Sequence, residues 1–418
     1  MRKVWWILFL SSALAQGAEL ASWVRESPGY AALKAQRAEA ALALEAARAG
    51  LLPTLAPQVD YAKTSLSESL SLGLGGSLAV LPWSDAQDAL AAAARALKQA
   101  DLELKAEGNA LFLEALGRYL EARLAELDLA LAEKRVALNE AQLAAAKAQE
   151  AQGQATFKDV LEAESALAEA KASLFAAQNA RALASARLER ILGREVAPKA
   201  LPLPQDPPSL EEALAALENR PDVALARLRL EEAEAALAQA SRDRTLPQGS
   251  LSLSLAQGGL GLSLSLDLGA GALGYALRYT ALGAAEGTSL RAGASLPLFA
   301  PVQEANQKVL ENRVAQAKLA LEAALKDGEL DLRQKHQARL HAEAQLAAAE
   351  TSLKAAEASL ETAKKRLQAG TGTRLEVLQA EVGFLQAQRT LEQAKANLLQ
   401  AHYALMDAMG IDLLGGER

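Results

Sequence analysis

The stretch GSLSLSLAQGGLGLSLSLDLG, residues 249–269, alternates leucine with serine, glycine or aspartate over most of its length. Successive side chains of an extended strand point to opposite faces, so a period of two collects the leucines on one face and the small polar residues on the other. Gln257, Gly258 and Gly259 interrupt the alternation and supply turn residues. The pattern therefore predicts a β-hairpin that is apolar on one face and polar on the other.

Two environments fit such a hairpin. Its leucine face could pack on the core of a soluble sheet, although core faces usually mix apolar side chains of different shapes that interlock. Alternatively, a face of leucine alone fits lipid, which requires no interlocking, while a serine and glycine face fits a water-filled lumen. The segment by itself leaves both environments open.

The N-terminal residues MRKVWWILFLSSALAQ combine a basic start, an apolar run and small residues around Leu14. This order is typical of a secretory signal peptide. We expect residues 1–15 to be a signal peptide and the exported chain to begin near Gln16, with an uncleaved N-terminal anchor as the alternative. No later run of about 18 apolar residues occurs, so we expect any membrane insertion to use strands.

Composition argues against several classes of function. A net charge of −7 gives no basic surface for nucleic acid, and the absence of cysteine excludes disulfides and metal–thiolate sites. The three histidines, His336, His341 and His402, have neither the spacing nor the neighbours of a metal site. No nucleophile, base and orienting group can be assembled around one cavity. We therefore predict no enzyme, no cofactor and no metal.

The chain contains an internal duplication. GQATFKDVLEAE at 153–164 resembles GTGTRLEVLQAE at 370–381. Near the start of each half, SPGYAALKAQRAEAALALEAARAGLLP at 27–53 resembles RPDVALARLRLEEAEAALAQASRDRTLP at 220–247. Because the landmarks recur in the same order, they indicate two structural repeats.

The proline-rich segment REVAPKALPLPQDPPS separates these repeats, because proline removes backbone donors and disfavours a helix. The predicted organisation is a first repeat at 16–193, a linker at 194–209, a second repeat at 210–411 and a C-terminal tail at 412–418.

Each repeat is predicted to contain a short helix, an extended region, a long helix, a glycine turn and a returning helix. The long helices have leucine and alanine at three- and four-residue spacing, which is typical of coiled coils. The predicted fold class is thus mainly α, with long coiled-coil hairpins and a small β part. The predicted positions are a β-hairpin at 55–81, a β region at 249–297, long helices at 84–152 and 301–369, and tip turns near 153 and 370.

One copy of the chain does not provide enough strands for a membrane barrel, since it offers about four to six and a barrel needs at least about eight. Strand edges cannot stay unpaired in lipid, so several copies would have to share one barrel. Their helical hairpins would then form a shared tube. An exported protein of this kind fits a conduit between two membranes.

Nearly the whole mature sequence resembles the TolC-like outer-membrane efflux proteins. The resemblance rests on the duplication, on RPDVALARLRLEEAEAAL at 220–237, on SLPLF at 295–299 and on RLQAGTGTRLEVLQAE at 366–381. It implies a homotrimer in the outer membrane that extends into the periplasm. It also implies a twelve-stranded composite transmembrane β-barrel and a helical α-barrel tunnel. The implied partners are outer-membrane lipid, a periplasmic adaptor and an inner-membrane efflux pump or ABC exporter, with small molecules or proteins exported passively.

The resemblance also places functional residues at the two glycine turns. The residues that would form the periplasmic tip and contact the adaptor are Gly153, Thr156, Gly370, Gly372 and Thr373. Those that would line the tunnel mouth are Glu376, Gln379, Asp159 and Arg374. The sequence departs from the family pattern at Gln379, where a second acid is frequent, and at Gly372, where an arginine is frequent. The alternative role for Glu376 and Asp159 is that of first-turn acids favoured by the helix dipole.

Two alternatives to a channel remain at this point, a periplasmic coiled-coil adaptor and a structural protein without a pore. An adaptor would typically have one hairpin flanked by β-domains, whereas this chain has two, and a structural coiled coil would not need leucine–serine strands. The sequence leaves open the transported substrate, the pump and adaptor, and whether residues 272–280 and 288–296 are membrane strands or an outer loop.

Overall fold

The computed structural model describes residues 14–63, 68–204, 207–246, 248–282, 287–295 and 301–415. These residues form two compact units, and each unit draws on both halves of the sequence. The first unit comprises Met1–Leu33, Lys105–Arg220 and Lys326–Arg418, and the second comprises Lys34–Leu104 and Pro221–Leu325. Residues 1–13 of the predicted signal peptide and residues 296–299 of the SLPLF motif lie outside the described residues.

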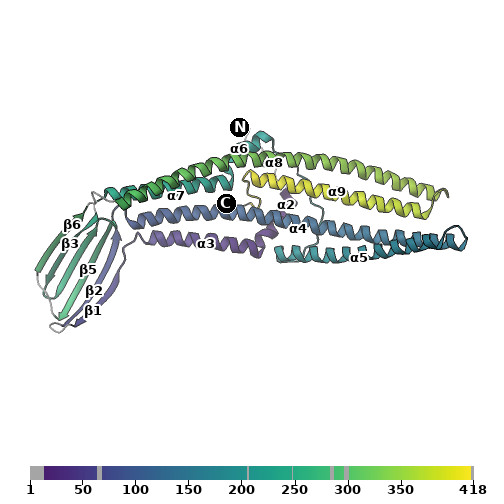
Figure 1. Ribbon diagram of the computed structural model, residues 1–418. Helices are drawn as coiled ribbons and strands as arrows, with labels where there is room; N and C mark the ends of the chain where they lie inside the picture. Colours follow the sequence, from purple (N-terminus) through teal and green to yellow (C-terminus); the bar gives the residue numbers. More distant parts are fainter. Residues whose placement is uncertain are drawn as a thin grey trace. The chain divides into compact units, whose positions relative to one another are not determined.

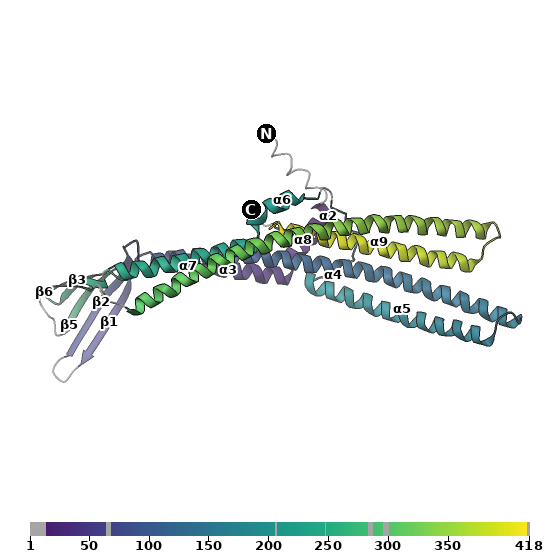
Figure 2. The same ribbon diagram turned by 45° about the horizontal axis from the view of Figure 1, so that its top comes forward.

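Two helical hairpins dominate the first unit. The C-terminal part of α4 (Asp85–Ala151) lies beside α5 (Phe157–Leu192), and that of α8 (Pro301–Gln368) lies beside α9 (Arg374–Ala408), as Figures 1 and 2 show. Both long helices end within one residue of the predicted bounds. Lys147 of α4 pairs with Glu164 of α5 at 2.8 Å, one of several surface ion pairs between these helices. Such pairs contribute little, so apolar packing supplies most of the stability.

The core of the first unit is built from alternating leucine and alanine, as the coiled-coil spacing predicts. Alanine lets the helix backbones approach closely, and leucine fills the space between them. One buried cluster joins α8 to α9 and consists of Ala342, Leu346, Ala349, Leu391, Ala394 and Leu398. A second joins them to the short helix α6 (Leu210–Ala215) and consists of Ala213, Leu332, Leu405, Ala408 and Met409.

Helix α2 (Leu14–Glu26) was not predicted from the sequence, which assigns its first residues to the signal peptide. Its side chains nevertheless belong to the core, since Leu20 and Val24 are fully buried. Trp23 of the same helix lies under the guanidinium of Arg194, 4.8 Å from the ring centre to Cζ. The segment after residue 15 is therefore an integral part of the first unit.

A buried histidine of the first unit makes its stability depend on pH. His402 of α9 is buried, and its Nδ1 has no hydrogen-bond partner within the part of the chain that the structure describes. Burial, followed by the positive charge of Arg339, lowers the pKa of His402 from 6.5 to about 4. The folded protein therefore keeps this imidazole neutral at pH values where an unfolded chain would protonate it.

We expect this group to lower the free energy of unfolding by about 2 kcal/mol between pH 7 and pH 5. The sign follows because the unfolded chain binds the proton near pH 6.5 and the folded chain only near pH 4. Thermal unfolding of the parent and of His402→Leu at both pH values measures the effect. The variant should lose less stability on acidification, and equal losses would contradict the prediction.

The second unit contains two shorter helices and a sheet. Helix α3 (Pro28–Ala49) lies beside the N-terminal part of α4, and α7 (Pro221–Thr245) lies beside that of α8 (Figure 1). Arg37 of α3 donates to Asp101 of α4 at 2.7 Å, and Arg244 of α7 pairs with Glu304 of α8 at 3.3 Å. Both short helices lie within the duplicated segments at 27–53 and 220–247.

The sheet has six strands in the order β1-β2-β5-β4-β3-β6, and every neighbouring pair is antiparallel. The predicted hairpin of residues 249–269 is β3 and β4, which pair from Ser250 with Asp267 to Gln257 with Leu260. Gly258 and Gly259 form its two-residue turn with φ of 59° and 83°, a left-handed conformation that glycine adopts without strain. The strand bounds are β1 Ala56–Lys63, β2 Glu68–Ala79, β3 Gln248–Gln257, β4 Leu260–Asp267, β5 Ala272–Leu282 and β6 Gly287–Ser295.

The number of strands differs from the expectation carried by the resemblance. A twelve-stranded barrel of three copies needs four strands from each, whereas the described residues of one copy form six. The two segments left open by the sequence are strands β5 and β6. β5 is held on both sides, by β2 and by β4, and β6 extends the sheet beyond β3.

Candidate functional site

The first tip turn joins α4 to α5. Gly153 has φ of 68°, and its N–H donates to the carbonyl of Glu150 at 2.8 Å, while the N–H of Gln154 donates to Gln149 at 2.9 Å. These bonds satisfy carbonyls at the end of α4 that would otherwise lack partners. Glycine at 153 therefore lets the chain reverse without strain.

A capping box begins α5 directly after this turn. The N–H of Asp159 donates to the Thr156 hydroxyl at 3.4 Å, and the Thr156 N–H donates to the Asp159 carboxylate at 2.7 Å. The bonds from Thr156 hold the pKa of the Asp159 carboxyl below its usual value. The carboxylate of Asp159 is thus engaged at the start of its own helix.

The second tip turn joins α8 to α9. Gly370 has φ of 72°, and the N–H groups of Thr371 and Gly372 both donate to the carbonyl of Arg366 at 3.0 Å. A Cβ at Gly372 would lie 2.9 Å from the Arg366 Cβ, so the turn itself favours glycine at this position. Thr373 then caps α9 by accepting the N–H of Glu376 at 3.2 Å.

The carboxylates of Asp159 and Glu376 differ in their hydrogen bonds at the helix caps. The cap of α9 lacks the reciprocal bond that Asp159 makes in the cap of α5, so the carboxylate of Glu376 is not engaged there. Arg374 is exposed and makes no hydrogen bond or ion pair with the residues that the structure describes. Glu376 is therefore the candidate acid whose charge is available to solutes or partners.

Glu376 and Gln379 line an open groove of about 620 Å³ between α8 and α9, next to the tip. The leucine and alanine spacing of the long helices predicts close packing at Ala356 and Ala363, but near the tip these small side chains leave space open. Arg366, near the C-terminal end of α8, also lines the groove. The complete lining is Ala356, Ser359, Thr362, Ala363, Arg366, Glu376, Gln379, Ala380 and Gly383.

The sheet is apolar on one face across all six strands. Directly paired residues of antiparallel strands share a face, so the register joins the leucines of neighbouring strands into one surface. It carries Val59 and Tyr61 of β1, Leu70, Leu72 and Leu74 of β2, Leu273, Tyr275, Leu277 and Tyr279 of β5, Leu260, Leu262, Leu264 and Leu266 of β4, Leu251, Leu253 and Leu255 of β3, and Leu290 and Ala292 of β6.

The opposite face consists mainly of serine and glycine. Its charged residues include Asp60 of β1, Arg278 of β5 and Arg291 of β6, and Asp60 pairs with Arg278 at 3.1 Å. Serines of neighbouring strands also bond on this face, as Ser254 does with Ser289 at 2.6 Å. An apolar face opposite a small polar face fits lipid on one side and water on the other.

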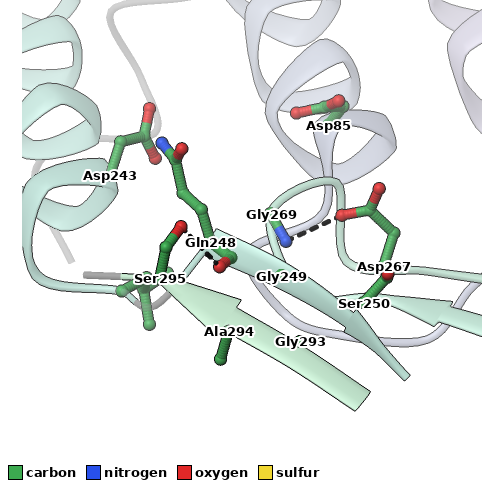
Figure 3. A pocket seen from close by; sticks show the side chains of 11 residues that line it. Asp85, Asp243, Gln248, Gly249, Ser250, Asp267, Gly269, Gly293, Ala294 and Ser295 are labelled. Carbon is green, nitrogen blue, oxygen red and sulfur yellow. Dashed lines mark hydrogen bonds between the residues drawn. The ribbon is translucent and has the colours of Figure 1, made fainter. Parts of the chain in front are cut away.

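At the helix-side end of the sheet lies an open pocket of about 740 Å³ (Figure 3). Asp85 of α4, Asp243 of α7 and Asp267 of β4 surround it. The Asp267 carboxylate at the end of β4 accepts a hydrogen bond from the N–H of Gly269. The Ser295 hydroxyl at the end of β6 donates to the carbonyl of Gln248 at the start of β3, at 3.3 Å. These bonds fix the strand ends beside the pocket. The lining is polar, with Ser250 and Ser295 beside the three carboxylates, and Asp243 is paired with Arg242 at 3.2 Å.

The described residues also lack two features that would point to other functions. No three histidine, cysteine or acidic side chains in this part of the chain are placed to hold a metal ion. Likewise, none of the helices described is both long enough and apolar enough to cross a membrane.

Comparisons with known proteins agree with this arrangement. The family model described as outer membrane efflux protein matches residues 24–194 and 214–411. No curated protein matches the chain by sequence. Similar solved structures include VceC of Vibrio cholerae, with 19% identity, a TM-score of 0.69 and coverage of 96% of this chain and 97% of that one.

Two further channels have the same fold. CmeC of Campylobacter jejuni is 16% identical, with a TM-score of 0.69 and coverage of 97% of this chain and 87% of that one. The open state of MtrE of Neisseria gonorrhoeae is 20% identical, with a TM-score of 0.67 and coverage of 95% and 89%. The likeness to these structures shows the fold alone. The family match spans most of the chain and therefore also shows the function. The chain therefore belongs to the outer membrane efflux protein family, as an outer-membrane channel that extends into the periplasm and serves as a transport duct, not an enzyme.

Proposed function

We propose that three copies of this chain form the exit duct of a tripartite efflux assembly. In this proposal a signal peptide at residues 1–15 directs export, and the turns at Gly153 and Gly370 contact a periplasmic adaptor. An inner-membrane efflux pump or ABC exporter delivers the substrate, which passes through the duct without chemical change.

An uncovered apolar face on α5 carries the proposal. Phe157, Leu161, Phe175 and Leu183 are 72%, 55%, 66% and 52% exposed in one copy. At 100° per residue these four positions fall on one side of the helix, so they form a stripe and are not scattered. A stripe of this kind requires a partner, and a helix of a second copy fits coiled-coil spacing. Phe157 and Leu161 lie next to the tip turn, where an adaptor would also reach them.

Expression of the full-length chain in a bacterium with an outer membrane tests the proposal. Membranes are fractionated, and the detergent-extracted protein is run unheated and heated on a denaturing gel, with a mass determination of the native particle. We expect recovery in the outer membrane, a mass of three copies, collapse to one copy on heating, and conductance across a planar bilayer. A soluble periplasmic monomer would contradict the proposal.

The free carboxylate of Glu376 predicts a measurable selectivity. If three copies bring three such groups to the tunnel mouth, they raise the local concentration of cations. We expect Glu376→Gln to lower the cation-to-anion permeability ratio by about twofold, measured as the reversal potential under a salt gradient. The matched control is Glu361→Gln, because Glu361 is already neutralised by Lys365 at 2.7 Å. Equal effects of the two variants would contradict a tunnel-mouth role.

A further inference from the structure

The charged side chains on the polar face of the sheet differ in how they are neutralised. Asp60 pairs with Arg278 at 3.1 Å, so these two charges cancel. Asp267, at the helix-side end of β4, accepts two backbone N–H groups of the following turn at 2.9 and 3.0 Å. Arg291 of β6 is exposed and has no hydrogen bond or ion pair with the residues that the structure describes. Its guanidinium therefore remains available to solutes.

Serine side chains flank Arg291 on this face. Ser252 of β3 pairs directly with Arg291, and Ser265 of β4 pairs with Ser252. Ser289 lies two residues along β6 and so on the same face, and its hydroxyl is hydrogen-bonded to that of Ser254 at 2.6 Å. Directly paired Cβ atoms are about 4.5–5.5 Å apart, within reach of a long side chain such as arginine. We call Ser252, Ser254, Ser265, Ser289 and Arg291 the arginine–serine patch.

The carboxylate of Asp267 is too distant to neutralise this patch. In the register, Asp267 lies two strands and two residues away from Arg291. With about 4.8 Å between strands and about 3.4 Å per residue, the two Cα atoms are roughly 12 Å apart. That separation exceeds the Debye length of about 8 Å at physiological salt, so the two charges interact only weakly. The patch thus combines one cation with four hydroxyl groups.

This set of donors fits an oxyanion. A guanidinium presents a fork of N–H groups that matches two oxygens of a carboxylate, phosphate or sulfate. Serine hydroxyls can donate further hydrogen bonds to the same group. Because the patch is exposed to water, such contacts are weak. Weak binding suits a duct, since a solute must leave the wall as readily as it arrives.

We propose that the arginine–serine patch is a weak oxyanion subsite on the water-facing wall of the duct, and that it favours solutes carrying a carboxylate, phosphate or sulfate group. The inference rests on the proposed homotrimeric duct, in which three copies of the patch face one lumen. The patch and the carboxylate of Glu376 should then act on ion selectivity in opposite directions.

Block of the channel current by inorganic tripolyphosphate tests the subsite. The detergent-extracted trimer is inserted into a planar bilayer at about 0.01 M salt, where the Debye length is about 30 Å, and the probe is titrated from either side. We expect Arg291→Gln to raise the half-blocking concentration about fivefold, the upper end for an exposed ion pair. Near 1 M salt the difference should disappear. All variants are measured in the same lipid, so block that depends on added tripolyphosphate comes from the soluble anion and not from headgroups.

Two further variants separate the charge of Arg291 from its geometry. Ser252→Glu places a carboxylate directly opposite the guanidinium, so it should weaken the block as Arg291→Gln does. Arg291→Lys keeps the charge but lacks the fork. In that variant the reversal potential should stay near that of the parent, while the half-blocking concentration rises.

The matched control is Asp60→Asn/Arg278→Gln, which removes an ion pair from the same face without a change in net charge. Its block should equal that of the parent, and a loss as large as that of Arg291→Gln would overturn the assignment to Arg291. Equal block in the parent, Arg291→Gln and Ser252→Glu would overturn the subsite and leave the duct intact. If Arg291→Gln forms no trimer, Ser252→Glu alone decides. A parent without a trimer or without conductance would overturn both the duct and the subsite.

Discussion

Replacement of Leu264 by arginine is expected to abolish assembly of the channel in the outer membrane. Leu264 lies near the middle of β4, where it pairs with Leu253 of β3 and Tyr275 of β5 on the apolar face. An arginine facing lipid at mid-depth costs roughly 2–4 kcal/mol, and each copy of the assembly would carry one. We expect at least about a tenfold loss of heat-sensitive trimer on unheated gels of outer-membrane fractions.

Two matched variants identify the cause. Ser263→Arg places the same charge one residue earlier on the serine and glycine face, where water can solvate it, so trimer recovery should stay near that of the parent. Leu264→Phe should also be tolerated, because lipid adapts to a larger apolar side chain whereas a packed core does not. Loss of the trimer in Leu264→Phe would indicate instead that the leucine face packs against protein.

A second large effect is expected for Gly410→Ala in the first unit. Gly410 follows the end of α9 with φ of 68°, and its N–H donates to the carbonyl of Asp407 at 2.8 Å. A Cβ here would collide with the backbone carbonyl of Asn219, which cannot move aside as a side chain could. The left-handed conformation and the collision together should cost about 3 kcal/mol. Thermal unfolding should then shift downward by about 6–12 °C.

Gly153→Ala is the matched control for this substitution. Gly153 has the same φ of 68°, but nothing lies within 4 Å of the position that its Cβ would take. Only the conformational cost remains, about 1 kcal/mol, so the shift should be about 2–4 °C. Equal shifts for the two variants would contradict the assigned collision with Asn219.

The helices could be predicted from the sequence because their signals are local. Leucine and alanine spacing identifies the long helices, Pro301 marks a beginning, and Gly153 and Gly370 mark the turns. The number of strands could not be predicted in this way. The segment ALGYALRYTAL of β5 alternates less strictly, and its place in the sheet depends on β2, about 200 residues earlier.

The tip turns could also be predicted, since glycine and threonine at their ends are local signals, but the groove beside them could not. Alanine at 356 and 363 predicts close packing of α8 against α9. Small side chains pack closely, however, only where the backbone of α9 comes near that of α8. Opposite them stand Ala380 and Gly383, which are also small, so the space stays open. The inclusion of Arg366 in the groove follows from this geometry and not from its position at a helix end.

The register of β2 with β5 has a consequence for how the protein folds. Leu72 pairs with Tyr279, so the sheet cannot form until the second half of the chain has been synthesised. Before then, β1 and β2 make only a two-stranded hairpin, which is marginally stable in water. Contacts that close so long a loop form slowly, while helical hairpins form from local contacts. The helices of the first half should thus mature early, and the membrane sheet should be the last part to assemble.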